Sequence, residues 1–153
     1  MKPELMHIPK PAGTVADILE AKGTEVHAIA PRETVYDAIV KMSEMRVGAL
    51  LVMEGPTLVG VVSERDYTRK IALQGRSSKD TPVSDIMTRE VLTVTPATGT
   101  RKCMALMSEK KIRHLPVLEE GRVLGIISIG DLVKAVIEDQ QHEIAQLQQY
   151  IAS

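Results

Sequence analysis

Aromatic residues are nearly missing from this 153-residue chain, which has no Phe, no Trp and only three Tyr. Proteins that bind single-stranded nucleic acid commonly stack the bases on aromatic side chains, so this scarcity argues against such a partner. The acidic and basic residues nearly balance, with a formal net charge of −1, so the overall field does not attract a phosphate backbone. We predict no nucleic-acid partner, and a core built from aliphatic residues and Met.

Cysteine and long apolar runs are also scarce. The single Cys103 cannot form an intrachain disulfide, and the four His residues lack the spacing of metal ligands. No stretch approaches the roughly 20 apolar residues that span a membrane. The N-terminal residues have no apolar segment typical of a signal peptide. We therefore expect a cytoplasmic protein with no membrane contact and no metal site.

Familiar catalytic motifs are absent from the sequence. It contains no G-x-x-x-x-G-K-[ST], G-x-G-x-x-G, G-x-S-x-G or H-E-x-x-H pattern. Cys103 falls on the apolar stripe of an expected helix, which favours a packing role over a nucleophilic one. The sequence therefore predicts no enzymatic activity and no catalytic cofactor.

The chain does contain an internal repeat. Residues 25–71 align with residues 90–136 without a gap at an offset of 65, and twelve of the 47 pairs are identical. Upstream, V-A-D-I-L from Val15 corresponds to V-S-D-I-M from Val83. We call the stretches that begin at these two valines the lead segments, and we expect each repeat to include its own. A unit of about 60 residues is marginally stable alone. We therefore expect the two copies to form one body with pseudo-two-fold symmetry.

Each copy carries the same order of local signals. A short β-rich run from Val26 or Val91 ends at a proline, and a helix follows, which in the first copy opens with a capping pattern at Thr34. Two β-rich runs then flank E-G-P or E-E-G, which predict tight hairpin turns. A second helix is expected to start at Ser63 or Ser128. The predicted fold is α+β, in two layers, from tandem β-α-β-β-α motifs.

The repeat also sets the expected boundaries. Motif 1 covers residues 14–74 and motif 2 covers residues 81–137, with an N-terminal extension, 1–13, and a C-terminal helical extension, 138–153. Apolar residues recur along the last helix at spacings of four and three, with one Gln on the same stripe, which is typical of a coiled coil. The members of this stripe are Val133, Ile137, Gln140, Ile144, Leu147 and Ile151. We expect a homodimer.

A seven-residue pattern, G-h-h-S-x-x-D, occurs once in each copy. It reads G-V-V-S-E-R-D from Gly60 and G-I-I-S-I-G-D from Gly125. The pattern resembles the cystathionine-β-synthase (CBS) domain family, whose tandem pairs are called Bateman modules. The run that continues from Ser63 to Lys79 is similar to CBS-pair proteins in which the pair is the whole polypeptide. The resemblance implies a regulatory module that usually dimerises and that binds AMP, ADP, ATP or NAD in clefts between the motifs.

The serine and the aspartate of this pattern are the predicted nucleotide-binding residues. Asp66 and Asp131 could each accept hydrogen bonds from both ribose hydroxyls. Ser63 and Ser128 stand at expected helix N-termini, where free N–H groups favour a phosphate. The same Ser-x-x-Asp spacing also describes a plain helix cap, and this alternative stays open. The apolar residues expected to line a slot for the adenine are Ile29 and Val94.

The two copies differ in charge around these carboxylates. Arg65 and Arg69 flank Asp66, whereas one basic residue, Lys134, and two acidic residues, Glu138 and Asp139, follow Asp131. We therefore predict the tighter site at Asp66. In the family, the turn that holds Arg113 and His114 here can reach a phosphate across the pseudo-dyad. These two residues are therefore candidates for the same cationic wall, with solvated surface charge as the alternative.

Two functions follow as hypotheses. The leading one is an adenine-nucleotide sensor in signal transduction, in which the ligand favours one packing of the motifs and so alters a surface that another protein recognises. The alternative is a ligand-independent dimerisation adaptor for a partner protein.

Overall fold

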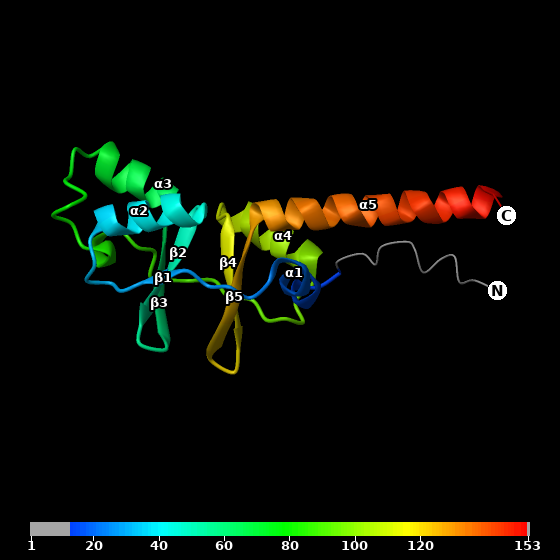
Figure 1. Cartoon of the computed structure of the whole chain (residues 1–153), viewed down its shortest axis with the longest axis horizontal. Helices are drawn as coiled ribbons and strands as arrows, with labels where there is room; N and C mark the ends of the chain where they lie inside the picture. The colour runs from blue at the N-terminus through cyan, green and yellow to red at the C-terminus, as the bar shows by residue number, and fades with distance from the viewer. Residues whose placement is uncertain (1–12, 153) are drawn as a thin grey trace. The chain divides into compact units, whose positions relative to one another are not determined.

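The computed structural model describes residues 13–152, so the predicted N-terminal extension, apart from Gly13, lies outside the described residues (Figure 1). The elements of the first copy are α1 (Val15–Lys22), β1 (Ala28–Ile29), α2 (Val35–Met45), β2 (Ala49–Glu54), β3 (Thr57–Ser63), α3 (Glu64–Tyr67) and the π-helical segment η2 (Thr68–Ala72). Those of the second copy are the 3-10 turn η3 (Val83–Asp85), α4 (Thr100–Lys110), β4 (His114–Glu119), β5 (Arg122–Ser128) and α5 (Ile129–Ala152). The mixture of helices and small sheets confirms the predicted α+β class.

The predicted helix starts and hairpins are confirmed in both copies. Thr34 caps α2 by accepting a hydrogen bond from the backbone N–H of Asp37 at 3.1 Å. The β2–β3 turn has Gly55 at φ 58°, and the β4–β5 turn has Glu120 at φ 51° and Gly121 at φ 78°. Left-handed residues in a two-residue loop match the twist of the paired strands, which explains why E-G-P and E-E-G close hairpins.

The first predicted strand of each copy differs from expectation. In the first copy it shrinks to β1, which pairs in parallel with β2 and is held by a hydrogen bond from Leu51 N–H to His27 O at 3.1 Å. In the second copy the run from Val91 forms no strand, only a parallel bridge between Val94 and Val117. The proline at position 116 aligns with Leu51 and has no N–H to donate, so the corresponding hydrogen bond cannot form.

The chain divides into two compact units, each of which is described by itself. One contains the described residues up to Thr24 with Val94–Val117 and the residues from Ile126 onwards. The other contains Glu25–Thr93 and Leu118–Gly125. Each unit therefore combines segments of both sequence repeats.

The lead segments account for this mixing. The backbone N–H of Val15 donates to Thr98 O at 2.8 Å, in the loop before α4. In the equivalent place, the N–H of Val83 donates to Glu33 O at 2.8 Å, in the loop before α2. Each repeat therefore has its own lead segment in the sequence, but in the structure that segment is bound by the loop before α4 or α2 of the opposite copy. The buried backbone N–H groups of such a segment need hydrogen-bond acceptors, and the carbonyl groups of the opposite loop supply them.

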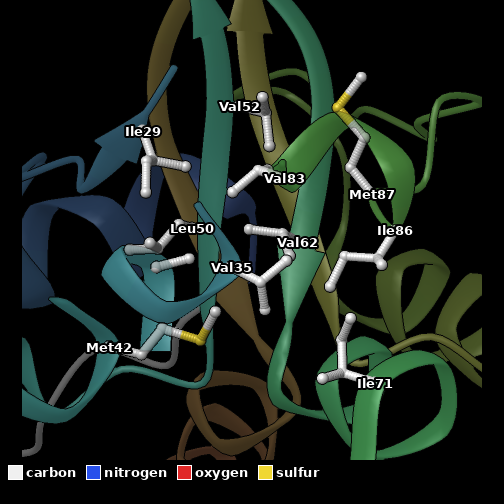
Figure 2. Packing of buried hydrophobic residues seen from close by; sticks show 11 residues of the cluster. Ile29, Val35, Met42, Leu50, Val52, Val62, Ile71, Val83, Ile86 and Met87 are labelled. Atoms are coloured by element: carbon white, nitrogen blue, oxygen red, sulfur yellow. The ribbon is translucent and has the colours of Figure 1, made fainter. Parts of the chain in front are cut away.

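A hydrophobic core fills the unit that contains Glu25–Thr93 (Figure 2). Its buried members are Ile29, Val35, Ala38, Met42, Leu50, Val52, Val62, Ile71, Val83, Ile86 and Met87. The aligned positions of the second copy are buried as well, among them Val94, Cys103, Met107, Leu115, Val117 and Ile127. The duplication therefore reuses one set of core positions.

Cys103 is fully buried on α4, at the position that Ala38 occupies on α2. Burial raises the pKa of its thiol, while the charge of Lys102 acts in the opposite direction. A thiol is a poor nucleophile, so the burial supports the predicted packing role. Among the described residues, no helix is long and apolar enough to cross a membrane.

Candidate functional site

Ser63 and Asp66 form a reciprocal hydrogen-bonded pair where β3 runs into α3. Asp66 Oδ2 accepts from the backbone N–H of Ser63 at 2.9 Å and from its hydroxyl at 3.0 Å. In return, Ser63 Oγ accepts from the N–H of Asp66 at 3.2 Å. The other carboxylate oxygen, Oδ1, lies 3.4 Å from Lys70 Nζ, one helical turn further along. The aspartate is thus fixed at a helix N-terminus with one oxygen in the cap and one beside a cation.

Ser128 and Asp131 repeat this geometry at the start of α5. Asp131 Oδ2 accepts from the N–H of Ser128 at 2.8 Å, and Ser128 Oγ accepts from the N–H of Asp131 at 3.2 Å. The difference lies in the cation, because Lys22 of α1 reaches the same Oδ2 at 2.7 Å and also donates to Ile126 O at 2.9 Å. The second carboxylate is therefore bound more tightly by a lysine than the first.

The same reciprocal cap occurs at a position where no ligand is predicted. At the start of α1, Asp17 Oδ2 accepts from the N–H and the hydroxyl of Thr14 at 3.1 and 3.2 Å. Helix capping alone therefore accounts for the geometry of the Ser-x-x-Asp pattern. In addition to the cap, Asp66 has the ammonium group of Lys70 at 3.4 Å and Asp131 has that of Lys22 at 2.7 Å.

Charge and burial also affect the protonation of the second set. Burial alone would raise the pKa of the Asp131 carboxyl, but hydrogen bonds from Lys22 and Ser128 together hold it below its usual value. Burial lowers the pKa of His114, as do the nearby Lys22 and Arg113, while Asp131 acts in the opposite direction. At neutral pH this set therefore offers an ionised carboxylate and a neutral imidazole.

The predicted basic residues lie either near Asp66 or in the unit that contains Asp131. Arg69 is exposed on η2, one turn beyond Asp66, and Arg65 is half-buried on α3. The backbone carbonyl of Arg113 accepts from the N–H of Ile129 at 2.9 Å, which fixes the turn before β4 at the N-terminus of α5. In the unit that contains α5, the structure thus places His114 within electrostatic range of Asp131 of its own copy, with Arg113 next to His114.

The residues predicted to line an adenine slot are core residues. Ile29 is 6% exposed and belongs to the core cluster of its unit (Figure 2). Val94 is 4% exposed and forms the parallel bridge to Val117. Little of either side chain is left to contact a ligand.

The first glycine of the repeated pattern has a packing role. A Cβ atom on Gly60 would lie 2.7 Å from Met87 Sδ and 2.9 Å from Thr88 O, both shorter than real contacts. This close approach lets Val61 and Thr88 exchange two backbone hydrogen bonds, at 3.0 and 2.9 Å. The glycine therefore allows the end of the second lead segment to pair closely with β3.

One surface hollow of about 430 Å³ lies in the unit of Glu25–Thr93, near the hairpin tips. It is lined by Pro56, Thr57, Leu58, Arg89, Val91, Thr93, Leu118 and Gly121. None of the predicted site residues lines it. Within residues 13–152 there is also no group of His, Cys, Asp and Glu that could hold a metal ion.

Lys22 is the site residue that sequence reasoning missed. It stands 109 positions before Asp131 and belongs to the lead segment of the opposite copy. The alignment could not reveal the contact, because it placed this segment with the first motif. The one signal in the sequence was that a basic residue, Lys22, stands at the end of the helix formed by the first lead segment.

A family known from other proteins matches this chain twice, once in each repeat. The sequence model of the CBS domain family matches residues 14–73 and 83–138. The CBS domain-containing protein CBSX3, mitochondrial, of Arabidopsis thaliana is 43% identical over 147 residues, which cover 90% of this chain and 71% of that protein. YhcV of Bacillus subtilis, also a CBS domain-containing protein, is 30% identical over 118 residues, 77% of this chain and 84% of that protein.

A solved structure of a protein with CBS domains from Burkholderia ambifaria shares the fold and much of the sequence. It superposes with a TM-score of 0.81 at 54% identity and covers 83% of this chain and 96% of that chain. The family match in two places, the relatives and the shared fold agree with the resemblance found in the sequence. The chain belongs to the CBS domain family and carries two CBS domains in tandem.

Proposed function

We propose that this chain is a regulatory protein that binds an adenine nucleotide, AMP, ADP, ATP or NAD, without turning it over. The observation that carries the proposal is the Ser63–Asp66 pair, an oriented carboxylate at a helix N-terminus with cationic residues on the following turns. Binding would report the level of the nucleotide to a partner protein. We further propose that the protein acts in the cytoplasm.

Asp66 is the proposed ribose anchor of the tighter site. Within residues 13–152, its Oδ1 has one long contact, 3.4 Å to Lys70 Nζ, so a ribose hydroxyl can approach this oxygen without breaking the cap at Oδ2. Lys70 Nζ is held by Ile86 O at 2.8 Å, which keeps its charge beside the carboxylate. Arg65 on α3 and Arg69 on the adjoining η2 would neutralise phosphates.

Asp131 is the proposed anchor of a weaker site or of a site for a different ligand. A ribose there would have to share Oδ2 with Lys22 or displace it from a 2.7 Å contact. Displacement also breaks the hydrogen bond from Lys22 to Ile126 O. Arg113 and the neutral His114 would face the anionic part of that ligand.

A more distant structure supports the class of ligand. A CBS domain protein from Pyrobaculum aerophilum, 23% identical with a TM-score of 0.69, was solved in complex with AMP. That protein shares the fold of this chain. The complex supports the proposal because it is a case in which this fold binds an adenine nucleotide.

Calorimetric titration of nucleotide-stripped protein with AMP, ADP, ATP and NAD tests the proposal. We expect saturable binding of at least one of them, and a loss of affinity of about ten- to a hundred-fold in Asp66→Asn, since one charged acceptor contributes about 1.5–3 kcal/mol. Asp131→Asn should leave the tighter site largely intact. Asp17→Asn is the matched control, because it alters the same kind of helix cap where no ligand is proposed.

Each result has a defined reading. No saturation with any adenine ligand up to millimolar concentration would reject the nucleotide proposal. Equal losses from Asp66→Asn and Asp131→Asn would reject the asymmetry between the sites. Normal binding by both variants, with apo melting temperatures lowered as in Asp17→Asn, would assign both aspartates to capping alone.

One observation favours the adaptor as a second candidate function. The apolar stripe of α5, from Val133 to Ile151, remains exposed in the described structure. A dimerisation adaptor needs such a surface and needs no nucleotide. The titration above separates the two functions, because an adaptor would show no saturable binding of any of the four nucleotides.

A further inference from the structure

Helix α5 carries an apolar stripe that its own unit does not cover. The helix spans 24 residues, and its first turns are anchored by Leu132 and Ala135, which are buried. The stripe lies on other positions of the same helix. Its exposed apolar members are Val133 (47%), Ile137 (48%), Ile144 (54%), Leu147 (61%) and Ile151 (81%).

The stripe follows a strict seven-residue repeat. Counting from Val133 as position d, the a positions are Ile137, Ile144 and Ile151, and the d positions are Val133, Gln140 and Leu147. β-Branched residues at a, combined with Leu at d, favour two-stranded coiled coils. All three a positions here are Ile, and Leu147 is the one Leu at d. We therefore take one further helix with the same a and d residues as the occupant of the stripe.

We propose that α5 pairs with α5 of a second copy of this chain as a parallel, in-register, two-stranded coiled coil over Val133–Ile151. At 1.5 Å per residue the paired segment is about 28 Å long. A second copy brings a stripe of the same length and the same a and d residues. The inference rests on this helix alone and does not depend on nucleotide binding.

The charges beside the stripe permit this pairing. In a parallel coiled coil each g residue meets the e residue that follows five positions later on the other helix. Here Glu143 at g would meet Gln148 of the partner subunit, and Val136 would meet Gln141 of the partner subunit. Neither pair sets like charges against each other, so no repulsion opposes a homodimer.

Gln140 decides the orientation. In a parallel, in-register pair it faces Gln140 of the partner subunit, and two amides can donate and accept hydrogen bonds across the seam. In an antiparallel pair with the stripe fully overlapped, it would instead face Ile144 of the partner subunit. A buried amide without a partner is unfavourable, and a single polar residue in the seam is known to set register and orientation.

The mass of the full-length protein in solution tests the pairing. Sedimentation equilibrium at high micromolar concentration should give twice the monomer mass of 16.8 kDa for the parent. Ile144→Glu should give the monomer mass. Gln146→Glu adds the same charge at an exposed position outside the seam and should remain dimeric. Ile144 is 54% exposed, so circular dichroism should show an intact fold in all three proteins.

The orientation has its own test, in a Cys103→Ala background that removes the native thiol. Gln140→Cys should oxidise to a covalent dimer, whereas Gln146→Cys should not. A parent that is monomeric, or an Ile144→Glu variant that stays dimeric, would overturn the coiled coil. Disulfides that form only in mixtures of Val133→Cys and Ile151→Cys chains, and not in Gln140→Cys, would show antiparallel helices and overturn the proposed orientation.

Discussion

Replacing Lys22 by Met tests how much the ion pair with Asp131 contributes to stability. Met keeps an apolar stem of similar length but removes the ammonium group, and with it the 2.7 Å contact to Asp131 and the 2.9 Å hydrogen bond to Ile126 O. The side chains are 35% and 22% exposed, so solvent screens the pair in part. The effect should fall between that of an exposed salt bridge, about 0.2–1 kcal/mol, and that of a charged hydrogen bond, about 1.5–3 kcal/mol. We expect a loss of about 1 kcal/mol.

The loss should appear as a lower melting temperature and should depend on pH. For a chain of this size about 1 kcal/mol corresponds to roughly 2–4 °C. The pKa of Asp131 is lower in the folded than in the unfolded state, so its ionisation stabilises the fold above the unfolded pKa. This contribution disappears as the pH falls through the lowered, folded pKa. The difference between parent and Lys22→Met should therefore be full at pH 7 and shrink from about pH 4 downwards.

Thermal unfolding of the parent, Lys22→Met, Asp131→Asn and the double variant completes the measurement. The double-mutant cycle isolates the interaction between the two side chains. Lys102→Met, which removes an exposed charge from α4 in the same unit, serves as the control. A difference that is constant from pH 3 to pH 7, or a coupling indistinguishable from zero, would refute an electrostatic role for Lys22.

Three further substitutions have definite expected effects on the free energy of unfolding, measurable by urea denaturation. Gly60→Ala should cost about 1–3 kcal/mol, because the new methyl group overlaps Met87 and the Thr88 carbonyl; an unchanged midpoint would show that the lead segment shifts freely. Arg46→Gly should stabilise by up to about 1 kcal/mol, because Arg46 ends α2 in the left-handed region at φ 57°; a loss would point to contacts of the arginine side chain. Leu50→Ala should cost about 2–5 kcal/mol, because Leu50 is fully buried in the core; a cost below 1 kcal/mol would contradict close packing around it.

Local features of the fold were predictable because short-range rules determine them. The turn residues at Gly55 and Gly121 and the caps at Thr34 and Ser63 each act within four residues, and the structure confirms all four. The strand predicted after residue 90 failed for a reason outside its own sequence. Pairing depends on the neighbouring strand, and Pro116 on that strand lacks the donor that the pair requires.

The candidate site was predictable only in its local part. The Ser63–Asp66 and Ser128–Asp131 pairs follow from their spacing, and the structure shows the hydrogen bonds of both. The contact from Lys22 depends on which copy receives the lead segment, and periodicity and composition carry no information about this choice. Whether an aspartate caps a helix, binds a ribose or does both likewise depends on its second oxygen, which spacing does not describe.

The exchanged lead segments have a consequence for the origin of this chain. A single ancestral repeat, folded alone, would leave its lead segment without the loop that binds it and would leave that loop without a lead segment. Two ancestral chains could satisfy both requirements by swapping these segments, as domain-swapped dimers do. Gene fusion would then have turned an obligatory association between chains into one within a chain. For the same reason, cutting the present chain between its repeats should yield fragments that fold only when mixed.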